Sequence, residues 1–436
     1  MRSNLITVVT AVASIVLTAG VATADQVQEQ LMLMEQRMAE MEDRLQATSD
    51  ELAAAQATVV EQQDLLIDSG LYEDEGLRSG AGGFFESVDV SGVAAASYNH
   101  RLIKSKDAVG GNALFKNPNA NTFQVDQIWI TMDKAPTEES RGGFHVEFMT
   151  GTSTANQGAN NGNPDVPYLY SGYVSYLAPI GNGVQVDLGK LGTVLGAEVV
   201  QTNGNYFITQ GAVFGLQPVT YNGVSFSTQI TDELGFSAGV VNDVYSDTDI
   251  SADNDKAYFG QFQYAGDAFG LNVGGIIGDA DASVCGAGAP TAGARNIECR
   301  VSVVDVVLTA DPTDNLSIWV NYDWVHQNGS GTGTAHGDAH GISGAGRLAL
   351  SDDMGVSSRV EYIWTEDTLG GTADDGELLT VTGTVDKTLA EGLVGRVELR
   401  YDTFLGGNGL GFAANGDAAG TNDEQLVALW QLYYEF

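Results

Sequence analysis

The feature that most constrains the fold is the alternation of apolar side chains in the segment that ends at the C-terminus. Every second residue there is apolar, at Leu426, Ala428, Trp430, Leu432, Tyr434 and Phe436. A period of two places all of these side chains on one face of a β-strand. Such a strand, ending in an aromatic residue, is typical of a closed barrel in a lipid bilayer, because closure leaves no backbone group unpaired in lipid. The last four apolar positions, Trp430, Leu432, Tyr434 and Phe436, are the predicted barrel-assembly signal.

The same pattern recurs upstream and predicts sixteen strands. The connections between them are alternately short and long, as in outer-membrane barrels, which have an even strand number, tight turns at one end and long loops at the other. We therefore predict an all-β transmembrane fold, a 16-stranded antiparallel outer-membrane β-barrel spanning residues 85–436. The predicted strands are 86–101, 122–133, 142–150, 168–178, 183–192, 218–230, 233–243, 255–265, 268–278, 298–310, 314–326, 340–350, 353–365, 376–387, 392–403 and 424–436.

Composition supports this class and excludes others. The chain has 55 Gly and a formal net charge of −38. Its body contains no apolar run of the roughly 20 residues that a membrane-spanning helix needs, so a helical membrane protein is not expected. A strongly acidic chain would repel phosphate backbones, so nucleic acid is not expected as a partner.

Residues 1–24 resemble a secretory signal peptide. Arg2 precedes an apolar run from Leu5 to Val21, and Ala22-Thr23-Ala24 supplies the small residues of a cleavage site. The alternative is an uncleaved anchor. Export of a barrel predicts that the protein resides in the outer membrane of a Gram-negative bacterium.

Residues 25–67 predict an α-helical coiled coil. Apolar residues recur in alternating steps of three and four, and the core positions are Leu31, Met34, Met38, Met41, Leu45, Leu52 and Val59. The helix would reach about 60 Å into the periplasm as a stalk. A Gly-rich linker, 68–84, joins it to the barrel. We expect a homo-oligomer, a trimer in preference to a dimer, formed through the coiled coil and the barrel wall; the alternative is a single surface helix.

Side-chain parity separates the lipid face from the lumen. In the segment 353–365, Val356 and Val360 share one face, whereas Arg359 and Glu361 share the other. In the segment 392–403 the inward face carries Arg396, Glu398, Arg400 and Asp402. Arg347, His145 and Glu147 also fall on the inward face of their strands. A lumen lined by charged groups remains hydrated.

A sixteen-stranded barrel is wide enough to enclose a water-filled channel and needs a constriction to be selective. The segment Thr193–Gln217, hereafter loop 3, is rich in Gly and apolar residues, so we predict that it folds into the barrel. Glu198 on this loop would then face arginines on the wall and create a transverse field. The predicted constriction residues are Glu198, Arg347, Arg359, Arg396, Arg400, Glu361 and Glu398. Alternatively, the arginines only neutralise Glu361, Glu398 and Asp402 along the wall.

Other candidate sites carry weaker signals. Cys285 and Cys299 lie in a predicted loop in an oxidising compartment, and a disulfide between them would constrain it by about 3 kcal/mol; free thiols are the alternative. Asp247, Asp249 and Asp253 have the alternation of calcium ligands, although a solvated acidic loop is the preferred interpretation. No metal site and no cofactor are therefore predicted.

Enzyme chemistry is not expected. The only arrangement of a nucleophile with a base would place His326, His336 or His340 near Ser330, within a Gly-rich loop. We predict no catalytic residue.

Several short motifs resemble a known family. Leu188-Gly189-Lys190, Glu198-Val199 after Gly196, Asn205-Tyr206 and Asn222-Gly223-Val224 are similar to the segment that marks the putative beta-barrel porin-2, OmpL-like proteins. The chain departs from that pattern at Phe207-Ile208-Thr209, where the family tends to carry an Arg. The resemblance implies a Gram-negative porin and passive diffusion of solutes.

The sequence thus predicts a porin that passes small hydrophilic solutes and ions and contacts the lipid bilayer and lipopolysaccharide. The alternative function is an envelope tether, in which the coiled coil binds peptidoglycan and the barrel is an anchor.

Overall fold

The computed structural model describes Met32 and residues 87–103, 121–156, 165–245, 256–280, 299–329, 336–367, 376–406 and 424–436. The chain divides after Glu86 into two units, and apart from Met32 every described residue belongs to the second. The predicted signal peptide, the coiled coil with its core residues and the linker lie outside the described residues, as do Asp247, Asp249, Asp253 and Cys285. Met32 itself is helical and exposed.

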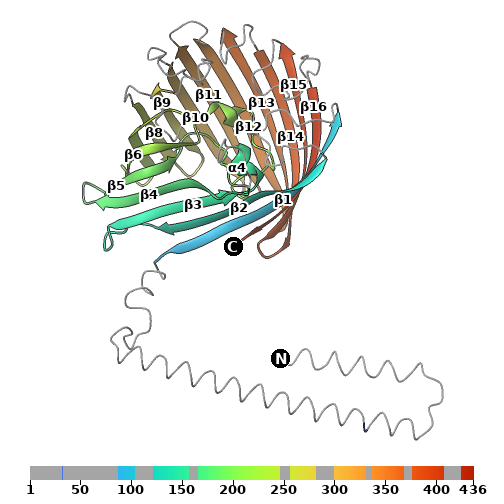
Figure 1. The fold of residues 1–436 in the computed structure, drawn as a ribbon, viewed down its shortest axis with the longest axis horizontal. Coiled ribbons are helices and arrows are strands. Elements are labelled where there is room, and N and C mark those ends of the chain that lie inside the picture. The colour runs from blue at the N-terminus through green and yellow to red at the C-terminus, as the bar shows by residue number, and fades with distance from the viewer. Residues whose placement is uncertain are drawn as a thin grey trace, which may run out of the picture. The chain divides into compact units, whose positions relative to one another are not determined.

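The second unit is a closed antiparallel barrel of sixteen strands (Figure 1). Each strand pairs with the next along the chain, and β1 pairs with β16 to close the ring. The strands are β1 (Asp89–Ile103), β2 (Thr122–Lys134), β3 (Gly142–Thr150), β4 (Tyr168–Ala178), β5 (Val184–Gly192), β6 (Thr220–Gln229), β7 (Leu234–Val241), β8 (Ala257–Ala265), β9 (Gly270–Asp279), β10 (Cys299–Thr313), β11 (Leu316–Gly329), β12 (His336–Ser351), β13 (Met354–Asp367), β14 (Gly376–Ala390), β15 (Leu393–Gly406) and β16 (Glu424–Glu435).

The predicted fold class, strand number and order are confirmed. The largest difference in boundaries is at β12, which begins at His336 rather than at residue 340, because Gly337 and Asp338 still pair with Gln327 and His326 of β11. The strand β10 also continues through Pro312 to Thr313, which pairs with Leu316, so the reversal is tighter than predicted.

The barrel wall is not uniform in height. Strands β3 to β9 contain between 8 and 11 residues, for example 9 in β3 and 8 in β7, whereas β10 contains 15 and β12 contains 16. We call β3–β9 the short wall and β10–β16 the tall wall; both are visible in Figure 1. The two walls differ in what they hold inside the barrel.

Parity along the strands follows the prediction. Val360 and Leu399 are 52% and 48% exposed on the outside, whereas their neighbours Arg359 and Arg400 are 0% and 1% exposed inside.

Two short helices, α4 (Thr152–Asn156) and the 3₁₀ helix η4 (Val213–Leu216), accompany the strands. No helix among the described residues is long and apolar enough to cross a membrane.

The predicted barrel-assembly residues Trp430, Leu432, Tyr434 and Phe436 are all exposed on the outer face. The last residue completes the ring, because its backbone N–H and C=O exchange hydrogen bonds of 3.1 and 3.0 Å with Gly92 of β1.

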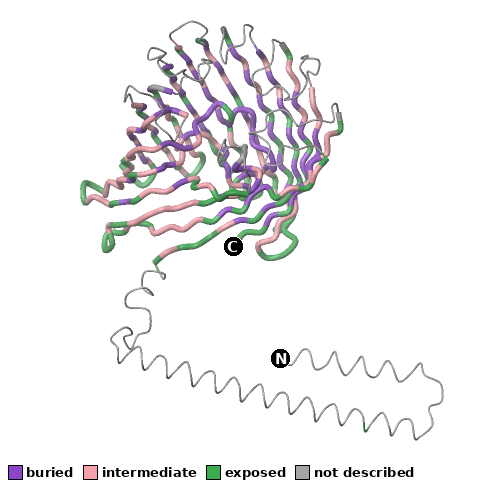
Figure 2. The backbone as a smooth tube through the Cα atoms, in the orientation of Figure 1, coloured by how far each residue is buried: buried purple, intermediate pink, exposed green. Residues whose placement is uncertain are grey.

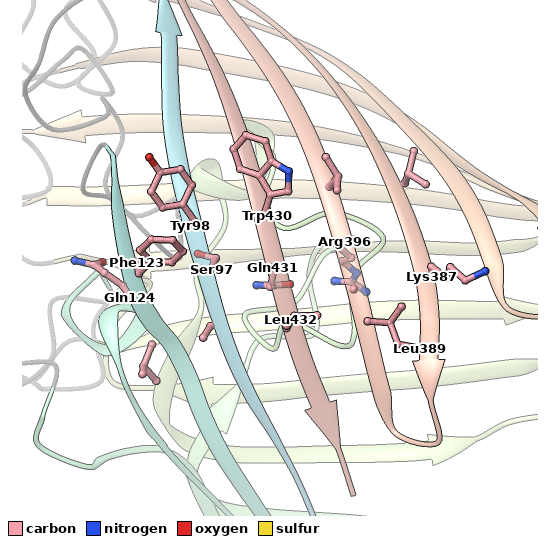
Figure 3. Close-up of a pocket in the computed structure, with 15 residues that line it drawn as sticks. Ser97, Tyr98, Phe123, Gln124, Lys387, Leu389, Arg396, Trp430, Gln431 and Leu432 are labelled. Carbon is pink, nitrogen blue, oxygen red and sulfur yellow. The ribbon is translucent and has the colours of Figure 1, made fainter. Parts of the chain in front are cut away.

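The outer face carries an apolar groove of about 760 Å³ over β1, β2 and β14–β16. At one end, Tyr98 packs against Phe123 and Trp430 at ring-centroid distances of 4.5 and 5.9 Å. Figure 3 shows these three rings, with Leu432 and Leu389 further along the groove. An apolar groove on this face suits contact with acyl chains or another apolar surface rather than passage of solute.

Candidate functional site

Loop 3 fills part of the lumen, as its apolar composition predicts. It leaves the wall after β5 and returns at β6, and Leu195, Val200, Phe207 and Ile208 on it are at most 3% exposed. Figure 2 shows this buried segment inside the ring of strands. Burial of these side chains against the inner wall removes apolar surface from water and stabilises the inward conformation.

Arg359 of β13 lies at the centre of the contact between loop 3 and the tall wall. Its guanidinium forms ion pairs with Glu198 of the loop and, at 3.0 Å, with Glu361 of its own strand. It also donates a 3.0 Å hydrogen bond to the carbonyl of Thr209 and stacks over Phe207 at 4.4 Å. A fully buried cation between two carboxylates is strongly favoured only while all three groups are present.

Glu398 of β15 binds the backbone of the loop. Its carboxylate accepts hydrogen bonds from the N–H of Ile208 at 2.6 Å and of Thr209 at 3.1 Å, and from the Thr209 hydroxyl at 2.5 Å. Thr384 of β14 donates a further bond of 2.9 Å. An ionised acceptor makes these bonds stronger than neutral ones, so Glu398 anchors the middle of loop 3.

Two further arginines of β15 bind loop carbonyls. Arg396 donates to the carbonyls of Thr202 at 2.9 Å and Asn205 at 2.8 Å. Arg400 donates to the carbonyl of Gln210 and, at 2.8 Å, to Asp402. Both side chains are therefore occupied by the loop or by the wall.

Arg347 of β12 behaves differently. It forms a two-point ion pair with Asp386 of β14, at 3.0 and 2.6 Å. Thus the structure brings Glu198, Arg359, Glu361 and Gly211 together, places Glu398, Arg396 and Arg400 under the same loop, and leaves Arg347 with a partner on the wall. That the seven predicted constriction residues, which do not include Gly211, narrow the pore stays a prediction.

Amide side chains that sequence reasoning missed hold the loop as well. Gln127 of β2 donates to the carbonyl of Val200 at 2.7 Å and accepts from the N–H of Thr202 at 2.9 Å, in the manner of a strand partner. Gln261 of β8 donates to the carbonyl of Val194. The alternation of side chains along their strands places Gln127 and Gln261 on the lumen face. No pattern in the neighbouring sequence, however, indicates that their hydrogen-bond partner is loop 3.

Both ends of loop 3 meet at β11. Asn321 accepts hydrogen bonds from the N–H of Ala197 at 3.3 Å and from the amide of Gln217 at 2.8 Å. Gln217 also donates to Asp323 at 2.7 Å. One strand thus fixes where the loop enters and where it leaves the lumen.

Gly211 brings the loop backbone between two carboxylates, and its N–H donates a 2.6 Å hydrogen bond to Glu198. A Cβ atom there would lie 2.3 Å from Oε1 of Glu361 and 2.7 Å from Oε2 of Glu198. We expect Gly211→Ala to displace loop 3 at a cost of about 1–3 kcal/mol, since overpacking strains a close-packed site. Single-channel conductance and limited proteolysis of the loop should both change. Gly383→Ala, whose Cβ meets no atom within 4 Å, is the control; equal behaviour of the two variants would contradict this placement.

Among the described residues, one cavity lies between loop 3 and β1–β3 and β16, and two others lie between loop 3 and strands of the short wall. Their volumes are about 510, 260 and 240 Å³. The side chain of Glu147 of β3 borders all three, and Gln201 of loop 3 donates a 3.2 Å hydrogen bond to it.

The remaining candidate residues are the two cysteines and the histidines with Ser330. Cys299, at the start of β10, is buried and disulfide-bonded, and its predicted partner Cys285 lies outside the described residues. His326 and His340 share the outward face of β11 and β12 with Ile342, and Ser330 is not described. Within the described ranges no group of three or more His, Cys, Asp or Glu residues is placed to hold a metal.

Solved structures share this architecture. An anion-selective porin from Comamonas acidovorans is 11% identical, with a TM-score of 0.56 and coverage of 80% of this chain and 99% of that chain. OmpT, an outer membrane protein of Vibrio cholerae, is 14% identical, with a TM-score of 0.54 and coverage of 80% and 97%. OprB of Pseudomonas putida is 10% identical, with a TM-score of 0.53 and coverage of 82% and 96%. Similarity at these identities shows the fold alone.

No curated protein matches the sequence. The family model described as "Putative beta-barrel porin-2, OmpL-like" matches residues 87–436, which is the whole barrel. The chain therefore belongs to the putative beta-barrel porin-2, OmpL-like family.

Proposed function

We propose that the protein is an outer-membrane porin, through which small hydrophilic solutes and ions diffuse down their gradients. The observation that carries this function is a closed sixteen-stranded barrel with a charged, water-accessible lumen into which loop 3 folds. Barrels of this strand number are wide enough for an aqueous channel, and an inward loop narrows it without closing it. No step in this function requires a cofactor.

The constriction that we propose is the gap between loop 3 and the short wall. Glu198, Arg359, Glu361, Glu398, Arg396 and Arg400 would define it by fixing the loop against the tall wall. Their contacts support this role, since every one of them touches the loop or a residue that does.

Conductance tests the porin function. The purified mature protein, inserted into a planar bilayer in KCl, is expected to give steady openings of nanosiemens order. A stable barrel that remains electrically silent would contradict the proposal and favour the tether, in which the predicted coiled coil binds peptidoglycan.

We further propose a homotrimer in a Gram-negative outer membrane, with the predicted stalk, 25–67, in the periplasm. The heptad pattern and the apolar outer groove support an oligomer. Closure of the channel in three equal steps, and a trimeric mass in detergent, are the expected results. A stalk-deleted barrel that still conducts would place the channel in the barrel, and binding of the full chain but not of the deleted one to peptidoglycan would support the tether as an added role.

A further inference from the structure

We infer that this pore conducts cations in preference to anions. The inference rests on the proposed porin function and concerns the sign of the ions that pass beside loop 3. It follows from the distribution of charged side chains between the tall wall and the short wall.

The tall wall holds the positive charges away from the solute path. Arg359 is fully buried between Glu198 and Glu361, and Arg347 is paired with Asp386. Arg396 and Arg400 are 6% and 1% exposed, and their guanidinium groups point at loop carbonyls. A positive charge that is paired or covered by the loop contributes little to the potential in open water.

The cavities beside loop 3 have acidic linings. Glu147 of the short wall borders all three, Asp187 of the short wall borders the 260 Å³ cavity, and Glu435 of β16 borders the 510 Å³ cavity. No Lys or Arg is among the described residues that line these three spaces. Low-dielectric walls around such acidic spaces focus a negative potential on passing ions.

Among the described residues, Asp187 of β5 has neutral hydrogen-bond donors and no ion pair with a Lys or Arg. Its carboxylate accepts hydrogen bonds from Ser175 at 2.6 Å and from Gln185 at 3.0 and 3.1 Å. Neutral donors orient the carboxylate but do not cancel its field. Ser225 and Ser237 line the same cavity, so a cation there would meet hydroxyl and carboxylate oxygens.

Glu147 likewise has no Lys or Arg partner among the described residues. Its partners are the Thr131 hydroxyl at 3.4 Å, Gln201 at 3.2 Å and His145, whose Nε2 lies 3.5 Å away. His145 is the single group lining these cavities that can become positive, and Asp133 holds its Nδ1 at 2.8 Å. Two carboxylates face this one imidazole, so the cluster is not positive even when the ring is protonated.

The test is the reversal potential of the full-length mature protein in a planar bilayer with a KCl gradient. The current through the wild-type channel is expected to reverse at a potential close to the potassium equilibrium potential. Removal of one unit charge about 5 Å from the ion path in water should change the local ion concentration about fourfold. The removed charge attracts K⁺ and repels Cl⁻, so the two factors multiply, and Glu147→Gln and Asp187→Asn are each expected to lower the K⁺/Cl⁻ permeability ratio by up to about 16-fold, with conductance retained.

Two controls isolate the cause. Asp352→Asn removes an exposed carboxylate from the turn between β12 and β13 and should leave selectivity unchanged. Glu147→Asp keeps the charge and should retain cation preference. A conducting wild-type channel that prefers chloride, or variants that leave the ratio unaltered, would overturn the inference while the porin function stands. An absence of conductance in the folded barrel would instead refute the porin function itself.

Discussion

Replacement of Arg359 by methionine is expected to free loop 3 while the barrel stays folded. The change leaves Glu198 and Glu361 buried without their cation and removes the hydrogen bond to the Thr209 carbonyl. Breaking a buried ion pair by deleting one partner costs about 3–5 kcal/mol. That cost would shift the equilibrium between seated and released loop by about 140- to 4,000-fold.

The measurement is single-channel recording together with proteolysis of the intact barrel. We expect larger and noisier openings and new cleavage within Thr193–Gln217. The substitution should destabilise the inward position of the loop and not the barrel wall. The wall is held by backbone hydrogen bonds between β13 and its neighbours, which the substitution does not remove.

Arg347→Met is the matched control. This arginine also lies on the inner face of the tall wall, but its ion pair is with Asp386 rather than with the loop. It should leave the conductance fluctuations and the protease sensitivity of loop 3 as in the wild type. Indistinguishable recordings from Arg359→Met and the wild type would mean that this ion-pair cluster does not hold the loop.

Deletion of Phe436 is expected to abolish most barrel assembly. Its backbone makes the last two hydrogen bonds between β16 and β1, at 3.1 and 3.0 Å to Gly92. Without them, backbone groups at the closure remain unpaired next to lipid, at a cost of several kcal/mol each. Its ring, 61% exposed on the outer face, also supplies an aromatic contact at the membrane interface.

The yield of folded protein should therefore fall to a small fraction of the wild type. It can be measured as the trypsin-resistant band that migrates anomalously in unheated SDS gels. Phe436→Tyr retains the backbone bonds and the aromatic ring and should assemble normally. Normal assembly of the deletion would show that closure between β1 and β16 does not depend on the terminal residue.

Features that arise from local patterns could be predicted from the amino-acid sequence. A period of two assigns each side chain to the lipid face or the lumen, and it correctly separated Val360 from Arg359. Turn chemistry marked the reversals, as at Gly181, whose φ of +59° suits a glycine. Because neighbouring strands in this topology are consecutive in the chain, strand number and order followed without any knowledge of long-range contacts.

Only the tertiary structure decided which charges meet. Asp386 as the partner of Arg347, and Gln127 as the partner of loop 3, depend on contacts between residues far apart in the chain. Side-chain alternation predicts that Glu398 faces the lumen. Its hydrogen bonds with the N–H groups of Ile208 and Thr209 depend on the route of loop 3 across the lumen, which the sequence pattern does not predict. Closure of the ring sets that route, because it fixes which inner-face groups lie within reach of the loop. Arg396 and Arg400 thereby meet loop carbonyls, whereas Glu147 and Asp187 line a cavity beside the loop.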